Sequence, residues 1–185
     1  MKKDQQTALL VMDVQAGIVA NFAKDTQLIS HIQTAIAAAR KKKLPIMYVK
    51  VTFREGFPEV SSNNKSFSMI KNRSDLFKDK KARDIHPDVA PIAGDIIVEK
   101  RRVSAFTGSD LEVILRSQNI SHVILCGIAT SGVVLSTLRE AADKDYQITV
   151  LSDCCTDSDD EVHTVLMTKV FPRQAEVLTV AEWLK

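Results

Sequence analysis

Runs of consecutive apolar residues alternate along this chain with longer segments in which apolar residues recur every three or four positions. The continuous runs predict buried strands at 7–13, 45–51, 95–100, 122–126, 147–151 and 175–178. The periodic segments predict amphipathic helices at 26–42, 109–117, 131–144 and 158–169. Strands that are apolar on both faces and separated by helices are typical of a parallel sheet covered on both sides. The sequence therefore predicts a doubly wound, three-layer α/β/α fold with a mainly parallel, six-stranded sheet.

The polar segment 52–90 interrupts this alternation. It contains Pro58, a Ser-Ser-Asn-Asn run at 61–64 and a charged stretch at 71–83. A connection of that length inside a compact domain usually has a function of its own, so we expect it to shape specificity. Short helices are expected within it, at positions that the pattern does not define. The 185 residues carry no repeat or linker, and we expect a single domain over residues 1–185.

Composition and charge narrow the range of partners and compartments. The chain has 25 basic and 23 acidic residues and a formal net charge of +2, which does not favour a nucleic-acid partner. The basic run at 40–43 ends a predicted helix, where cations face the helix dipole favourably. The first residues lack the long apolar stretch of a signal or membrane segment. Cys126, Cys154 and Cys155 are an odd number without zinc spacing, so we expect reduced thiols in the cytoplasm.

Two charged residues stand where a doubly wound sheet binds ligands. Asp13 ends the first predicted strand, Lys100 ends the third, and the turn at 127–133 leaves the fourth. Ligands of such sheets bind outside the carboxyl ends of the strands, so these features are expected to face one crevice. An aspartate and a lysine in a partly desolvated site support each other's charge and can exchange protons with a substrate. A structural ion pair, or two solvated strand ends, is the alternative.

Short motifs follow one another along nearly the whole chain. They are Asp13-Val14-Gln15, then Lys100 with Ser104-Ala105-Phe106 and Gly108-Ser109-Asp110-Leu111, then Gly127-Ile128-Ala129-Thr130, and last Val150-Leu151-Ser152-Asp153. Together they resemble the signatures of the isochorismatase-like (cysteine hydrolase) family. The resemblance implies the fold predicted above, a small-molecule substrate, a homo-oligomer, and a non-proline cis peptide between Ile128 and Ala129.

The catalytic triad of that family is aspartate, lysine and cysteine, and Asp13 and Lys100 match its first two members. In the triad the aspartate takes the thiol proton, and the thiolate attacks an amide or related carbon beside an oxyanion hole of backbone N–H groups. Alignment of the Gly-x-Ala-Thr turn puts Val133 at the nucleophile position. Valine carries no nucleophile, so chemistry excludes an acyl-enzyme there. Isochorismatases proper hydrolyse a vinyl ether without the cysteine, although they carry glycine where this chain has the bulkier valine.

The motifs and the end of the second strand also provide candidate substrate-binding residues. These are Gln15, Arg54, Phe106, Ala129 and Thr130. Arg54 is able to hold a substrate carboxylate by a bidentate contact, with Arg101 and Arg102 as further candidates. Thr130 or Ser131 is expected to cap the following helix and present N–H groups to an anion. A surface arginine and a helix cap without a ligand are the alternatives.

No metal or cofactor is predicted. Nicotinamidases of this family carry a D-x-H type ligand cluster after the second strand, where this chain has Phe53-Arg54-Glu55-Gly56-Phe57. The four histidines, His31, His86, His122 and His163, lie at unrelated spacings. Nicotinamidase activity is therefore disfavoured by the missing ligands as well as by the missing thiol.

Three functional hypotheses remain open. The first is a hydrolase of a small, anionic metabolite in which Asp13 is the general acid and Lys100 its electrostatic partner, without covalent catalysis. That role requires burial to raise the pKa of Asp13. The second is a non-catalytic family member that binds a small molecule or serves in assembly. The third is a cysteine hydrolase whose thiol has moved to Cys126, Cys154 or Cys155. The retained charged pair favours the first.

Overall fold

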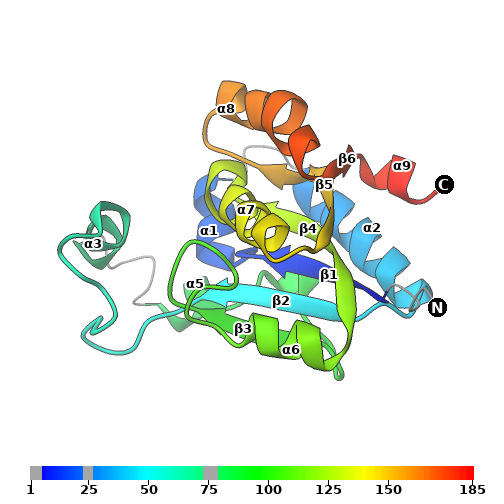
Figure 1. The fold of residues 1–185 in the computed structure, drawn as a ribbon. Coiled ribbons are helices and arrows are strands. Elements are labelled where there is room, and N and C mark those ends of the chain that lie inside the picture. Colours follow the sequence, from blue (N-terminus) through cyan, green and yellow to red (C-terminus); the bar gives the residue numbers. More distant parts are fainter. Residues whose placement is uncertain (1–5, 23–26, 73–78) are drawn as a thin grey trace.

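A parallel sheet of six strands forms the centre of the computed structural model, which describes residues 6–22, 27–72 and 79–185 (Figure 1). Its order is β3-β2-β1-β4-β5-β6, and the neighbouring strands pair in parallel. The strands are β1 (Gln6–Met12), β2 (Ile46–Val51), β3 (Ile96–Lys100), β4 (Ile120–Ile128), β5 (Gln147–Thr156) and β6 (Glu176–Leu178). The predicted doubly wound fold is therefore confirmed.

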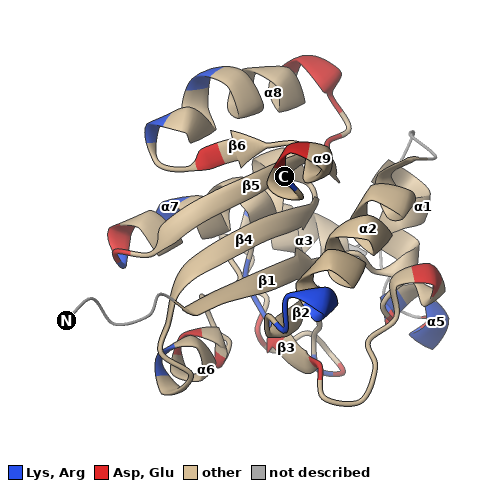
Figure 2. Cartoon of the chain, turned by 90° about the vertical axis from the view of Figure 1, so that its right-hand side faces the viewer, with Lys and Arg blue, Asp and Glu red and all other residues tan. Residues whose placement is uncertain are grey.

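Helices cover both faces of this sheet. They are α1 (Ala16–Phe22), α2 (Gln27–Lys41), α3 (Lys65–Asn72), α5 (Lys80–Arg83), α6 (Leu111–Ser117), α7 (Leu135–Asp143), α8 (Asp160–Val165) and α9 (Val180–Trp183). α2 and α9 lie over one face, whereas α6 and α7 lie over the other (Figures 1 and 2). Figure 2 shows acidic and basic residues interspersed over both layers. Within the described ranges, no helix has the length and apolar character needed to cross a bilayer.

Some elements differ from those that the sequence predicts. The pattern does not predict α1 or α9, because no residue of α1 is buried and α9 has only four residues. β5 continues to Thr156 instead of ending at Leu151, past a register shift in its pairing with β4. Cys154 and Cys155 lie beyond the predicted end of this strand at residue 151 but within the observed β5, so the predicted end is wrong. The start of the helix predicted at 26–42, Thr26, lies outside the described residues.

The segment between β2 and β3 carries α3, α5 and a helical turn at Pro87–Val89. α3 stands away from the main body of the molecule in Figure 1. The segment returns to the sheet through a backbone bridge between Gln15 and Ile85 and a hydrogen bond of 2.9 Å from the His86 N–H to the Val14 carbonyl. Its last part is therefore anchored beside the end of β1.

The strand registers bring the ends of four strands to one edge of the sheet. Met12 pairs with Gly127 of β4 and with Val49 of β2. Val51 of β2 pairs with Lys100 of β3. The backbones approach so closely at Gly127 that a Cβ atom there would lie 2.0 Å from the Met12 carbonyl oxygen, and its φ of 143° also favours glycine. The residue after β1 and the last residue of β3 thus lie on either side of the end of β2.

Candidate active site

Asp13 is the first residue after β1, and its backbone leaves the strand in a left-handed conformation with a φ of 56°. Its N–H still donates to the Val49 carbonyl at 2.8 Å, so the chain turns only after this last sheet contact. The side chain is directed at Lys100, with Oδ2 lying 2.8 Å from Nζ. Asp13 is 6% exposed and Lys100 2%. The structure therefore brings the two predicted residues together in an ion pair that is nearly closed to water.

The Lys100 ammonium uses its remaining donors on the loop that follows β3. Nζ donates to the carbonyl oxygen of Arg102 at 3.0 Å and to that of Val103 at 2.9 Å. With the contact to Asp13, these bonds account for all three N–H groups of the ammonium. One carboxylate and two backbone dipoles therefore hold the charged amine and fix its direction.

The loop that receives the Lys100 amine is itself fixed to α7. Ser104 Oγ donates to a Glu140 carboxylate oxygen at 2.6 Å. The Ala105 N–H donates to the Thr137 hydroxyl oxygen at 2.9 Å, and Ala105 is fully buried. The Ser-Ala pair of the second motif therefore supports the lysine from behind, because the carbonyl groups that bind Nζ cannot move without breaking these contacts.

The second carboxylate oxygen of Asp13 distinguishes this pair from an ordinary structural ion pair. Oδ1 is buried and has no hydrogen-bond partner among the residues that the structure describes. Burial raises the pKa of Asp13 above its ordinary value, against the lowering effects of Lys100 and of the Val51 backbone. A buried acceptor without a partner is costly, and it is expected where a substrate or water supplies the hydrogen bond. The geometry suits a carboxyl group that exchanges a proton at Oδ1.

The turn after β4 begins next to this pair, because β4 is the other neighbour of β1. It contains the cis peptide between Ile128 and Ala129 that the family resemblance implied, so that prediction is confirmed. The helix predicted at 131–144 starts as a distorted turn, Thr130–Val134, which is kinked at Gly132 and becomes regular only in α7. The turn therefore leaves the sheet edge along a path that the helical pattern does not predict.

Groups within the chain occupy the predicted anion site of that turn. The Ser131 N–H donates to Asp157 Oδ2 at 2.7 Å, and Thr130 Oγ1 lies 2.8 Å from His163 Nδ1. Ala129 holds the cap position, so the prediction that Thr130 or Ser131 caps the helix is wrong. Burial by itself raises the pKa of Asp157. Hydrogen bonds from Ser131 outweigh this effect and bring the pKa below its ordinary value. An internal carboxylate thus satisfies the helix start.

Comparison with known protein families covers nearly the whole chain. The isochorismatase domain family matches residues 7–182. The chain belongs to the isochorismatase family. The isochorismatase family protein YwoC of Bacillus subtilis is 31% identical over 181 residues, which cover 98% of this chain and 94% of that protein. The ureidoacrylate amidohydrolase RutB of Serratia proteamaculans is 28% identical over 171 residues, which cover 80% of this chain and 69% of that protein.

Solved structures of the isochorismatase family share this architecture. A family member from Burkholderia thailandensis superposes with a TM-score of 0.82 at 28% identity, covering 96% of this chain and 93% of that chain. A cysteine hydrolase from Pseudomonas syringae superposes with a TM-score of 0.85 at 21% identity, covering 100% and 97% of the two chains. At that identity the second likeness concerns the fold alone.

Val133 is the residue that the alignment places at the nucleophile position of the isochorismatase family. It lies in the turn after β4 and is 2% exposed. An apolar, buried side chain has no proton to give and no lone pair to attack with. The position therefore contributes packing to this member of the family, and a nucleophile, if the reaction uses one, has to come from water or from another residue.

The three cysteine thiols are poor candidates for that role. Cys126 is fully buried and donates its S–H to the Leu10 carbonyl at 3.4 Å. Burial raises the pKa of Cys126 and Cys154 far above the ordinary thiol value, and that of Cys155 to about 12. A thiol with such a pKa holds a thiolate fraction on the order of 10⁻⁵ at neutral pH. The third hypothesis from the sequence is disfavoured accordingly.

The arginines near the site have different surroundings. Arg54 is an exposed side chain whose Nη1 lies 2.5 Å from Glu59 Oε1. Arg101 also pairs with Glu59, with its Nε lying 3.6 Å from Oε1. The Arg102 guanidinium lies 6.0 Å from the centre of the Phe67 ring, and its Nη1 donates to the Arg101 carbonyl at 2.7 Å. It forms no ion pair with a carboxylate of the described ranges. Of Arg54, Arg101 and Arg102, only Arg102 has no carboxylate partner within the described ranges.

Two further candidates for substrate binding are engaged within the protein. The Gln15 carboxamide binds the backbone of Val51 and of Arg83. The buried Phe106 ring packs on Tyr146, with ring centroids 5.9 Å apart. The structure therefore places Gln15 beside the charged pair as a partner of backbone groups. It places Phe106 against Tyr146, in the connection between α7 and β5.

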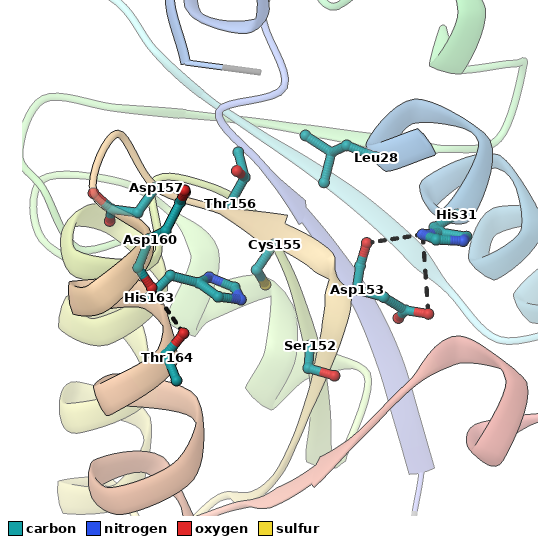
Figure 3. A pocket seen from close by; sticks show the side chains of 10 residues that line it. All are labelled: Leu28, His31, Ser152, Asp153, Cys155, Thr156, Asp157, Asp160, His163 and Thr164. Atoms are coloured by element: carbon teal, nitrogen blue, oxygen red, sulfur yellow. Dashed lines mark hydrogen bonds and ion pairs between the residues drawn. The ribbon is translucent and has the colours of Figure 1, made fainter. Parts of the chain in front are cut away.

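A polar pocket of about 290 Å³ lies at the end of β5, between α2 and α8 (Figure 3). Its walls are Leu28, His31, Ser152, Asp153, Cys155, Thr156, Asp157, Asp160, His163 and Thr164. His31 points at Asp153 in Figure 3, with Nδ1 lying 3.2 Å from the Asp153 carbonyl oxygen. The sequence does not predict this pocket, because its residues come from distant segments without a shared motif. In the described part of the chain, no three His, Cys, Asp or Glu side chains are placed to hold a metal ion.

Proposed function

We propose that this isochorismatase-family protein hydrolyses a small, anionic metabolite through the Asp13–Lys100 pair, without a covalent thiol intermediate. The observation that carries the proposal is the buried contact of 2.8 Å between Lys100 Nζ and Asp13 Oδ2, beside a buried Oδ1 that finds no partner in the described ranges. A relative named as an amidohydrolase supports hydrolysis as the reaction class. Valine at position 133 and the high thiol pKa values argue for a reaction that uses water directly.

The proton of this reaction is carried by Asp13. Burial favours the neutral acid, so Asp13 delivers a proton to the vinyl-ether carbon of the substrate and an oxocarbenium ion forms. Lys100, at 2.8 Å, stabilises the carboxylate that is left behind. Water adds to the oxocarbenium carbon and returns a proton to Asp13. The resulting hemiketal transfers its hydroxyl proton to the ether oxygen as the bond between that oxygen and the hemiketal carbon breaks, and a ketone and an alcohol leave.

A substrate carboxylate is proposed to bind Arg102 rather than Arg54. The backbone carbonyl of Arg102 accepts a hydrogen bond from Lys100 Nζ, so the loop that carries this arginine lies beside the pair. Arg54 is exposed and already matched by Glu59. A guanidinium can grip a carboxylate with two parallel hydrogen bonds. The backbone of the turn at Ala129 is proposed to complete the substrate site from the β4 side.

Two broader expectations accompany this proposal. The family resemblance suggests a homo-oligomer, and three reduced, buried cysteines suit the cytoplasm. Light scattering on the purified protein tests the first expectation, since a monomer mass contradicts it. Fractionation of the source cells tests the second.

A hydrolysis screen on purified protein tests the proposed reaction. Isochorismate is offered beside a panel of amides to the wild type, to Asp13→Asn and to the control Asp95→Asn. The control also removes one carboxylate from an ion pair, that with Arg40 at 2.7 Å, at the opposite end of β3. We expect isochorismate turnover that Asp13→Asn abolishes and the control keeps.

Two results of the screen contradict the proposal. Amide turnover that is lost after alkylation with iodoacetamide indicates a relocated thiol. Absence of turnover with every compound, in protein shown to be folded, indicates a non-catalytic member of the family that binds a small molecule or serves in assembly.

A further inference from the structure

Gln15, the third residue of the first motif, is held entirely by backbone groups. It is 1% exposed. Its Oε1 accepts a hydrogen bond from the Val51 N–H at 2.9 Å, and its Nε2 donates to the Val51 carbonyl at 3.2 Å and to the Arg83 carbonyl at 2.7 Å. Both N–H bonds of the carboxamide are thus used inside the protein. Gln15 therefore acts on the site through the backbone and not through contact with a substrate.

The Gln15 carboxamide takes the place of a peptide group in the sheet. β1 and β2 pair up to Met12 and Val49, and the Asp13 N–H makes the last backbone contact at 2.8 Å. The chain then turns away in the left-handed conformation of Asp13. Val51 lies two residues further along β2 and is past the reach of the β1 backbone. An amide offers one acceptor and two donors, so the side chain of Gln15 satisfies the Val51 N–H and carbonyl as a neighbouring strand does.

Val51 connects this carboxamide to Lys100. The two residues are register partners between β2 and β3, and the Thr52 N–H donates to the Lys100 carbonyl at 3.1 Å. A continuous set of hydrogen bonds therefore runs from the Asp13 turn through Gln15 and Val51 to the strand end that carries Lys100. The spacing between Asp13 and Lys100 depends on this set, because the two residues lie on opposite sides of β2.

The backbone of Gln15 is anchored as firmly as its side chain. Its carbonyl accepts hydrogen bonds from the N–H groups of Ile18 and Val19, both at 2.9 Å, at the start of α1. It also forms the antiparallel bridge with Ile85. The carboxamide is therefore presented from a fixed position, and a small change in it moves the end of β2 relative to Asp13.

We propose that Gln15 is a positioning residue, whose carboxamide replaces a peptide group beside Val51 and thereby sets the distance between Asp13 and Lys100. The kinetic consequence of this inference rests on the proposed function, whereas the consequence for the Asp13 titration does not. A misplacement of about 1 Å in a catalytic group lowers a rate by about 100-fold.

Three variants of the full chain test the inference. Gln15→Leu removes all three hydrogen bonds. Gln15→Glu keeps an acceptor for the Val51 N–H and loses both donations, so it preserves part of the contact if the leucine variant does not fold. The control is Thr149→Val, which removes a buried hydrogen bond of 2.9 Å to His122 Nε2 in the middle of β5.

Two readouts separate positioning from stability. The first is kcat and KM for the substrate found in the screen. We expect kcat to fall about 100-fold in Gln15→Leu and less in Gln15→Glu, with KM nearly unchanged. The second is the titration of ¹³C-labelled Asp13, assigned by its loss in Asp13→Asn. We expect its midpoint to differ from that of the wild type, because a looser pair weakens the lowering effect of Lys100 and also admits water. The control is expected to change neither readout.

Each outcome of these measurements decides the inference. A wild-type kcat together with an unchanged Asp13 titration in both Gln15 variants overturns it. A shifted titration in a protein that hydrolyses nothing supports the positioning role while the proposed function fails. A control that changes kcat as much as the Gln15 variants do also overturns the inference, since general destabilisation then explains the effect.

Discussion

Replacing Lys100 by methionine leaves the Asp13 carboxyl buried without its counter-ion. Asp13 is 6% exposed and Lys100 2%, and the pair spans 2.8 Å. Removing one partner of a buried pair costs about 3–5 kcal/mol while the other remains charged. If Asp13 takes up a proton, the cost falls to that of the lost hydrogen bonds, about 1–2 kcal/mol. The penalty is therefore expected to depend on pH.

The direction of that dependence follows from proton binding. Burial already raises the pKa of Asp13 in the wild type, and Lys100 opposes this effect. Without Lys100 the folded carboxyl keeps its proton to still higher pH, whereas the unfolded carboxyl ionises with its ordinary pKa of about 3.9. The folded state then binds more protons, so its stability falls as pH rises through the raised pKa. Lys100→Met is thus expected to lose the least stability relative to the wild type in acid and the most in alkali.

Urea unfolding at several pH values, followed by circular dichroism, measures this effect. The assay includes Asp13→Asn and the double variant, which is expected to lose less stability than the sum of the two single variants. Lys144→Met is the control, because it breaks a surface pair of 2.6 Å with Glu112. A Lys100→Met penalty that is equal at every pH, or a double variant that is simply additive, refutes the description of a coupled, buried pair.

Three further predictions concern other parts of the fold. Gly127→Ala places a Cβ atom about 2.0 Å from the Met12 carbonyl oxygen, so we expect a loss of about 3 kcal/mol or more in unfolding free energy; a wild-type urea midpoint contradicts the close strand approach. Thr179→Ala removes the N-cap of α9, for which we expect a loss of about 1 kcal/mol in the same assay. Cys155, with a pKa of about 12, is expected to react with iodoacetamide far more slowly in native than in unfolded protein, as mass spectrometry can follow; rapid native labelling contradicts this.

The features that the sequence predicts well are those that depend on local pattern. The strands are readable because they are apolar on both faces, and a parallel sheet requires their carboxyl ends to meet at one edge. That requirement alone places Asp13 and Lys100 close together. The family motifs add the cis peptide after Ile128, and they predict that Val133 stands at the position of the family's nucleophile.

The features that the sequence does not predict depend on contacts between distant segments. Arg54 was a candidate for a substrate carboxylate, but Glu59 lies close enough to take its charge. Gln15 was a candidate for substrate binding, but its partners are backbone groups of Val51 and Arg83, which no motif identifies. Neither contact can be read from the spacing of apolar residues in the sequence. Both depend on how the segment between β2 and β3 folds back onto the sheet.

The pH dependence of kcat/KM for isochorismate hydrolysis by the wild type tests the central claim most directly. If Asp13 acts as a general acid, the active form is protonated, so kcat/KM falls as pH rises, with a midpoint above the ordinary aspartate value of 3.8. Asp13→Asn is expected to lose both the activity and this titration. A kcat/KM that rises with pH, as a thiolate or a general base requires, contradicts the account.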